Sequence, residues 1–314
     1  MSLIEQAARR LEQLRGAGVE LPDEVTSPPL RQGSGKAARS DADSHAVAIP
    51  TPRPVSEEKK AAATVSKRIE LDLDAISASG LLVPQASRSQ LADEFRVIKR
   101  PLLANATGKG GEPVANGNLI MVTSALPGEG KSFTAINLAI SIAMELDNTV
   151  MLVDADVAHP SVLRMLGLPP APGLLDVVGK NSVDISGVLM RTNIEKLSIL
   201  PSGTPHSRAT ELLASDAMVR LLNDMASRYS DRIIIFDSPP LLLTTESRVL
   251  ATHMGQIVVV VHAESTTQVA VRQAIDTIEN CPVKMMILNQ ARQASSDGYG
   301  YGYGYGYGYG HEKK

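Results

Sequence analysis

Short apolar runs alternate with longer stretches of helical periodicity through the middle of the chain. Between residues 118 and 290, six runs have the length expected of buried strands, namely LIMV, TVMLVD, LSIL, RIIIFD, QIVVVV and KMMILN. The stretches between them, such as FTAINLAISIAMEL and RATELLASDAMVRLLNDMA, carry apolar residues at helical intervals. This regular alternation predicts an α/β fold built on a doubly wound, mainly parallel sheet.

A further amphipathic helix is predicted just before this region, in SRSQLADEFRVIKRPLL. One face of that helix is apolar and carries Leu91, Phe95, Ile98 and Leu102. Another face has a charged residue at every third position: Asp93, Arg96 and Lys99. Two interpretations of the charged face stay open, a solvated surface or a contact between subunits.

The two ends of the chain differ in composition from the middle. Residues 1–20 contain a capping-box pattern followed by apolar residues at helical spacing, which predicts a short amphipathic helix that either frays or docks onto a partner. Residues 21–65 are rich in Pro, Ser and Ala and predict a disordered linker. The folded domain is expected over 66–293, and the Tyr/Gly repeat within 294–314 predicts a disordered tail.

Charge and composition exclude several classes of protein. Lys and Arg total 31 against 34 Asp and Glu, so a net charge of −3 gives no general attraction for nucleic acid or membrane surfaces. No apolar run is long enough to cross a bilayer, and the opening residues are too charged for a signal peptide. The lone cysteine, Cys281, fits a reducing compartment. These features predict a cytoplasmic protein.

Residues 125–132, ALPGEGKS, stand between a predicted strand and a predicted helix. They match the phosphate-binding pattern G-x-x-x-x-G-K-[ST] except for Ala at the first position. The glycines let backbone N–H groups turn toward phosphate oxygens, Lys131 can reach the β- and γ-phosphates, and the Ser132 hydroxyl can ligate Mg²⁺. The sequence therefore predicts a site for ATP and Mg²⁺. Its candidate nucleotide-binding residues are Pro127, Gly128, Glu129, Gly130, Lys131, Ser132 and Phe133.

Three aspartates lie at or just past the ends of predicted strands. Asp154 and Asp156 belong to MLVDAD, and Asp237 ends RIIIFD. Because ligands of such sheets bind beyond the carboxyl ends of the strands, all three are expected beside the phosphate loop. A single strand-end Asp is often only a helix cap, but three beside one loop predict Mg²⁺ and general-base groups. The candidate catalytic residues are therefore Lys131, Asp154, Asp156 and Asp237.

These motifs resemble those of the bacterial tyrosine autokinases (BY-kinases), which accompany exopolysaccharide chain-length proteins. The resemblance covers residues 66–310 and rests on SALPGEGKS as the Walker A motif, LVDAD as the A′ motif, IIIFDSPP as Walker B and the tyrosine cluster. The opening SLIEQAARRLEQLR is similar to the cytosolic, separately encoded branch. The resemblance implies that Asp154 accepts the tyrosine proton, and that Ser132, Asp156 and Asp237 hold Mg²⁺.

The resemblance also implies partners and a role. A BY-kinase of this branch would phosphorylate its own tail in trans and thereby regulate exopolysaccharide polymerisation and export. It would form a ring-shaped homo-oligomer, bind a membrane chain-length-determinant protein (a polysaccharide co-polymerase) and be reset by a tyrosine phosphatase, with no nucleic-acid partner. Its place would be cytoplasmic, peripheral to the inner membrane through that partner.

The chain departs from the family pattern at two places. Family members commonly carry arginines after the A′ motif, where this chain has Ala158-His159 before a proline. The family's oligomer helix carries E-x-x-R-x-x-R, which is matched here by Asp93, Arg96 and Lys99. Lysine cannot form the bidentate fork of arginine, so this subunit contact is expected to differ.

The tail GYGYGYGYGYGYG holds six of the seven tyrosines of the chain: Tyr299, Tyr301, Tyr303, Tyr305, Tyr307 and Tyr309. Alternating glycine keeps such a segment adaptable and leaves each phenol accessible to a phosphate site. From Ala294 to Tyr309 the chain can span roughly 50 Å, far enough to reach a neighbouring subunit. These tyrosines are the candidate phosphoacceptors; the alternative is a tail that only self-associates.

Two other functions fit parts of the sequence. One is a MinD/ParA-like P-loop ATPase, although such partitioning and septum-positioning proteins have an extra lysine where this chain has Leu126. The other is a nucleotide-gated adaptor on a membrane polysaccharide complex, with the tail as a sticky low-complexity segment. The fate of the γ-phosphate of ATP distinguishes them: it ends on tyrosine for a kinase, free in solution for an ATPase, and stays on ATP for an adaptor.

Overall fold

The computed structural model of the chain describes residues 66–291, apart from 87, 110, 112–113, 180–182 and 229–231. The predicted N-terminal helix, the linker and the tyrosine tail therefore lie outside the described residues. Within the described part, eight strands form one sheet in the order β1-β4-β5-β3-β6-β2-β7-β8. Their bounds are β1 Lys67–Arg68, β2 Leu119–Ser124, β3 Thr149–Asp154, β4 Met190–Arg191, β5 Leu197–Leu200, β6 Arg232–Asp237, β7 Gln256–His262 and β8 Val283–Asn289.

The sheet is mainly parallel, as predicted. The strands from β5 to β8 in the spatial order all run the same way, and each corresponds to one of the six predicted apolar runs. The exceptions lie at the other edge, where β4 is antiparallel to β5 and β1 pairs with β4. The carboxyl ends of the central strands therefore meet at one edge of the sheet, where the predicted site residues lie.

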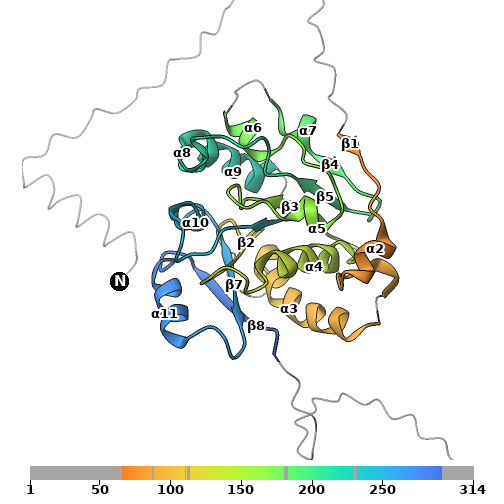
Figure 1. The fold of residues 1–314 in the computed structure, drawn as a ribbon, viewed down its shortest axis with the longest axis horizontal. Helices are drawn as coiled ribbons and strands as arrows, with labels where there is room; N and C mark the ends of the chain where they lie inside the picture. The colour runs from red at the N-terminus through yellow and green to blue at the C-terminus, as the bar shows by residue number, and fades with distance from the viewer. Residues whose placement is uncertain are drawn as a thin grey trace, which may run out of the picture. The chain divides into compact units, whose positions relative to one another are not determined.

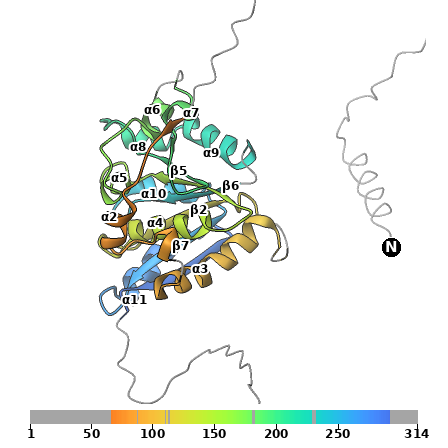
Figure 2. The ribbon, with the colours of Figure 1, turned by 90° about the vertical axis from the view of Figure 1, so that its right-hand side faces the viewer.

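Helices cover both faces of the sheet (Figures 1 and 2). Successive residues of a strand point to opposite faces, so that Ile120 and Val122 join one apolar core while Leu119 and Met121 join the other. The first core lies beneath α2, α3, α4 and α5, and the second beneath the later helices. The helix bounds are α2 Leu73–Ala78, α3 Gln90–Thr107, α4 Lys131–Ala143, α5 Val162–Met165, α6 Leu174–Gly179, α7 Ile185–Val188, α8 Ala209–Leu213, α9 Asp216–Arg228, α10 Thr245–Ala251 and α11 Gln268–Asp276.

The predicted helical stretch over 208–226 is two helices, α8 and α9, rather than one. Ser215 makes the break because its hydroxyl serves both helix ends. It donates to the carbonyl oxygen of Leu212 at the end of α8 and accepts from the N–H of Met218 in the first turn of α9. Such side chain-to-backbone bonds compete with helix continuation.

Helix α3 buries its apolar face as predicted, but Lys99 is not on its exposed face. Lys99 is only 4% exposed, and its Nζ lies 2.5 Å from Glu145 Oε1 and 2.6 Å from the carbonyl oxygen of Ser141. The long lysine side chain thus ties α3 to the end of α4. The burial of Lys99 and its pairing with Glu145 argue against the expectation that this lysine contacts another subunit, which stays a prediction. Among the described residues, no helix is long and apolar enough to span a membrane.

Candidate active site

The phosphate loop lies between β2 and α4, as the motif predicts. Gly128 and Gly130 have φ angles of 82° and 95°, in the left-handed region that glycine adopts without strain. Gly130 is also the N-cap of α4, so the loop leads straight into the positive end of that helix. A Cβ atom at Gly130 would lie 2.1 Å from Asn289 Nδ2, so a side chain here would displace Asn289 as well as strain the backbone.

Glu129 braces this loop from behind. Its side chain is buried; Oε2 accepts a 2.6 Å hydrogen bond from the N–H of Leu126, and Oε1 accepts another from the Thr266 hydroxyl. Asn289 Nδ2 donates to the carbonyl oxygen of Glu129 at 2.9 Å. The Glu129 carboxylate therefore supports the loop from within the chain, and for nucleotide binding only the backbone of Glu129 stays a candidate.

A cleft of about 820 Å³ opens in front of the loop. Every predicted nucleotide-binding residue except Glu129 lines it, as does Asp156. The remaining lining residues were not predicted from the sequence: His159, Ser161, Arg164, Met165, Pro239, Pro240, Leu243 and Thr244. The volume falls in the range of about 300–1,000 Å³ usual for small-molecule sites.

The three predicted aspartates come together at adjacent strand ends. Asp154 and Asp237 are direct partners in the pairing of β3 with β6, and Asp156 follows two residues after Asp154. All three are at most 2% exposed. Lys131 Nζ contacts Asp156 Oδ2 at 2.7 Å, so the loop lysine and one carboxylate form an ion pair within the cleft.

Asp154 is held by backbone donors on one side only. Its Oδ2 accepts from the N–H groups of Ser161 and Val162 at 3.1 and 3.0 Å, while its buried Oδ1 has no hydrogen-bond partner. Burial, followed by the repulsion of Asp237, raises the pKa of Asp154 from 3.8 to about 7. Asp154 lies behind the cleft rather than on its surface, since Asp156 and not Asp154 is among the lining residues.

Asp237 also keeps one unsatisfied oxygen. Its Oδ1 is buried without a partner, and its Oδ2 lies 3.4 Å from the Ser161 hydroxyl. Burial raises the pKa of Asp237 to about 6, against the opposing attraction of Lys131. Ser161 Oγ in turn donates to Ser132 Oγ at 2.7 Å. Ser161 therefore joins both aspartates to the phosphate loop.

The donor set suits Mg²⁺ in its usual protein setting. Among the described residues no group of three or more His, Cys, Asp and Glu side chains could hold a metal. Mg²⁺ needs no such cage, because it is bound by one or two carboxylates, retained waters and substrate phosphates. The buried and unpartnered Oδ1 of Asp237 and the nearby Ser132 hydroxyl are hard oxygen donors of that kind.

Arg164 supplies a cation that the sequence pattern did not reveal. The chain lacks arginines directly after LVDAD, but α5 begins there, and Arg164, in the last turn of α5, lies on the cleft. A recognisable signal existed for Ser161, since serine after proline and before an apolar run is typical of a helix N-cap. The tyrosines proposed as acceptors lie outside the described residues, so their position relative to the cleft stays a prediction.

The chain resembles known proteins over this region. An AAA-domain family matches residues 117–290. Tyrosine-protein kinase YwqD of Bacillus subtilis (strain 168) is 33% identical over 182 residues, which cover 57% of this chain and 75% of YwqD. The succinoglycan biosynthesis transport protein ExoP of Rhizobium meliloti (strain 1021) is 30% identical over 67% of this chain, but over only 26% of ExoP. The crystal structure of the chimerical protein CapA2B2 aligns with a TM-score of 0.56 at 26% identity, covering 71% of this chain and 93% of that structure.

Proposed function

Because the chain belongs to the bacterial tyrosine-protein kinase family, we propose that it is an autokinase that transfers the γ-phosphoryl group of ATP to its own tail tyrosines. The observation that carries the proposal is the buried carboxylate cluster around the loop lysine, combined with six tyrosines in one terminal repeat. A partitioning-type ATPase has no use for such a repeat, and position 126 lacks its additional lysine.

The residues of the cleft would divide the chemistry between them. Lys131, the amides of the loop and Arg164 bind and orient the phosphates of ATP. The phenol oxygen attacks the γ-phosphorus, the bond from phosphorus to the bridging oxygen of ADP breaks, and the phenolic proton passes to Asp154 Oδ1, which becomes accessible from the cleft when the substrates bind. A carboxylate whose pKa is about 7 is suited to accept a proton near neutral pH.

Mg²⁺ bound with ATP neutralises phosphate charge, and Ser132, Asp156 and Asp237 would hold it. The Lys131 ammonium is paired with Asp156 in the structure. When phosphates enter the cleft, Lys131 therefore exchanges one anionic partner for another. The ion pair holds the Lys131 ammonium in the cleft, so neither Lys131 nor Asp156 is left as an unpaired buried charge.

The similarity to ExoP also supports a wider role. ExoP is by name a succinoglycan transport protein, which supports a role for this chain in regulating exopolysaccharide polymerisation and export. We propose that the kinase forms a homo-oligomer, docks on a membrane chain-length-determinant protein from the cytoplasmic side, and is reset by a tyrosine phosphatase. The segment 1–20 or the nucleotide-side surface is the proposed docking point.

Incubation with γ-labelled ATP and Mg²⁺ tests the activity. The purified, phosphatase-treated chain should acquire label on tyrosine, and Lys131→Met should abolish that label because the phosphates lose their cation. Mass spectrometry should place the modification within Tyr299–Tyr309. Free labelled phosphate without phosphotyrosine would indicate an ATPase, and undiminished phosphotyrosine in Lys131→Met would refute the assignment.

The direction of transfer needs a second experiment. An inactive Asp154→Asn chain that keeps its tail is mixed with an active chain truncated after Gln293. Label is expected on the inactive chain, because the tail is long enough to reach another subunit. Labelling that never appears at any concentration would mean that each chain modifies only itself.

A further inference from the structure

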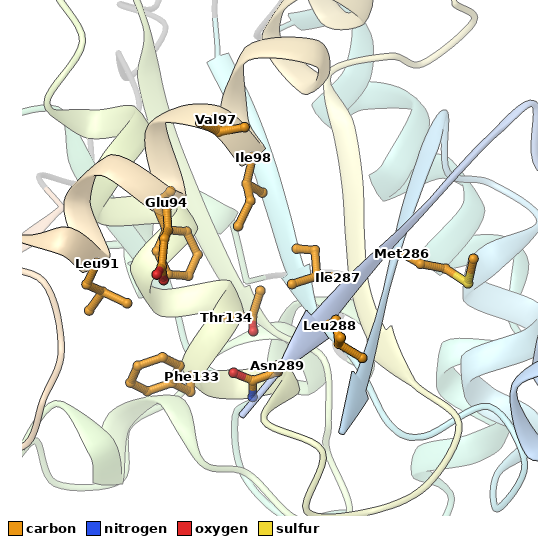
Figure 3. A pocket seen from close by; sticks show the side chains of 11 residues that line it. Leu91, Glu94, Val97, Ile98, Phe133, Thr134, Met286, Ile287, Leu288 and Asn289 are labelled. Carbon is orange, nitrogen blue, oxygen red and sulfur yellow. The ribbon is translucent and has the colours of Figure 1, made fainter. Parts of the chain in front are cut away.

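A second hollow, of about 440 Å³, lies between α3 and β8 (Figure 3). Its walls are mainly apolar: Leu91, Phe95, Val97 and Ile98 come from α3, and Ile287 from β8. Glu94 is the only charged residue that lines it. Val97 is 71% exposed, which is unusual for a branched apolar side chain beside a groove. We refer to this hollow as the α3/β8 groove.

The groove runs along an open edge of the sheet. Within the described residues β8 pairs only with β7 and ends the strand order. Its exposed positions carry Met286 and Leu288, which are 62% and 64% exposed. An edge strand with unpaired backbone groups and apolar side chains is a template for an added extended segment.

The groove also adjoins the nucleotide site. Phe133 lines both the groove and the cleft, and Asn289 lines the groove while its Nδ2 holds the carbonyl of Glu129 in the phosphate loop. Whatever occupies the groove therefore contacts residues that position the loop.

We propose that the groove binds the dephosphorylated tyrosine tail of the same chain, residues 294–314. The inference rests on the proposed function of that tail as the phosphoacceptor. The chain leaves β8 at Asn289, itself a groove residue, and Gln290 has a φ of 57°, so the backbone changes direction at once. Tyr299 stands ten positions after Asn289, which is ample length for the tail to return along the strand.

The repeat has the right period for this surface. In an extended segment alternate side chains lie on opposite faces, so the Tyr-Gly repeat places all six phenols on one face and bare glycine on the other. The phenols face the apolar wall of α3, whereas the glycines lie on the opposite face of the added strand, whose backbone edge pairs with β8. Most of the residues that line the groove are aromatic or aliphatic, and its polar lining residues are Glu94, Thr134 and Asn289.

Phosphorylation would release the tail. The residues that line the groove include no Lys, Arg or His, so a phosphate finds no cation there. Each phosphotyrosine adds roughly −1.5 to −2 charges near pH 7, beside Glu94 and in an apolar setting. The groove therefore binds the tail close to the phosphate loop while its tyrosines are unmodified, and releases the tail once they are phosphorylated.

Energy transfer from tyrosine to tryptophan tests this docking, because the chain has no tryptophan and its tail carries six of its seven tyrosines. A Met286→Trp reporter is introduced into the full-length Lys131→Met chain, which needs no kinase activity for the measurement. Sensitised tryptophan emission should exceed that of the same chain truncated after Gln293. Adding Val97→Glu in the groove should lower the emission to the truncated level. The matched change Val269→Glu, on α11 at 65% exposure, should leave it unchanged.

Each alternative has its own outcome. Equal emission with Val97→Glu and Val269→Glu would show that the tail is only tethered nearby, and would overturn the proposal. Emission that rises with protein concentration would assign the groove to the tail of a second copy. Loss of emission in a chain lacking residues 1–20 would show that the N-terminal segment is needed, which also contradicts direct docking. If no phosphotyrosine forms in the active reporter chain, the proposed kinase function fails while the docking result stands.

Discussion

Asp154 and Asp237 each retain one buried oxygen without a hydrogen-bond partner, whereas Asp156 is neutralised by Lys131. Unpaired buried oxygens destabilise a fold, since their desolvation is not compensated. In the proposed kinase these oxygens would find partners when ATP, Mg²⁺ and the acceptor tyrosine bind.

This arrangement predicts how stability depends on pH. The pKa of Asp154 is about 7 in the folded chain and 3.8 normally, so between these values the folded state holds a proton that the unfolded state has released. The free energy of unfolding therefore falls as the pH rises through this window, by about 1.4 kcal/mol per unit of pKa difference. Asp154→Asn removes the effect. The measurement is made with a chelator and without nucleotide. The increase in Tm of Asp154→Asn over the parent chain should be largest above about pH 7.

An exposed aspartate provides the control for that measurement. Asp224 pairs with Arg228 on the surface of α9 and is not among the residues that line the cleft. Asp224→Asn should shift Tm by a similar small amount at pH 5 and pH 8. If the Tm gain of Asp154→Asn is the same at both pH values, the carboxyl of Asp154 is not protonated near neutral pH. Asp154→Asn should also lose tyrosine phosphorylation while still binding ATP.

At the scale of elements, the far edge of the sheet supports the phosphate loop. Thr266, in the turn between β7 and α11, and Asn289, at the end of β8, both bond to Glu129. The conformation of the loop therefore depends on the residues of its own motif and also on residues more than a hundred positions later in the chain. This explains why a glutamate inside the motif is buried.

Thr266→Val tests this support. The change keeps the shape of the side chain but leaves Glu129 Oε1 without its donor, and hydrogen bonds to charged groups are worth about 1.5–3 kcal/mol. We expect about tenfold weaker ATP binding, measured by titration calorimetry, which corresponds to about 1.4 kcal/mol. Thr252→Val is the matched control, because its hydroxyl bonds only to the carbonyl of Val249 on the surface. Unchanged affinity in Thr266→Val would mean that the loop holds its shape alone.

The central strands could be predicted because burial on both faces makes them continuous apolar runs. The strands β1 and β4 could not, since each has two residues and no period to detect. Likewise, the phosphate loop and the strand-end aspartates follow from local motifs. The burial of Lys99 does not, because it depends on Glu145, which only the packing of α3 on α4 brings near.

At the scale of the whole molecule, the charge of the tail links modification to assembly. Six phosphotyrosines would add roughly −9 to −12 charges to a chain whose net charge is −3. In a ring these tails would lie near one another, and their repulsion opposes association. Of the three residues expected at the subunit contact, Lys99 is buried, and Asp93 and Arg96 pair with each other on one helix. Such exposed pairs contribute little to assembly.

We therefore predict a cycle in which the dephosphorylated, ATP-bound chain assembles on its partner and loosens once its tails are phosphorylated. Sedimentation of both forms with partner, ATP and Mg²⁺ measures it, and the dephosphorylated form should sediment as the larger species. The difference should narrow from about 0.05 M to 0.5 M salt, because exposed charges are screened within about 10 Å at 0.1 M. A chain whose six tail tyrosines are changed to phenylalanine is the control for effects of ATP other than tail phosphorylation, and it should stay assembled. If the phosphorylated and dephosphorylated forms sediment alike at low salt, charge repulsion does not drive disassembly, and the phosphorylated tail acts by recruiting another protein.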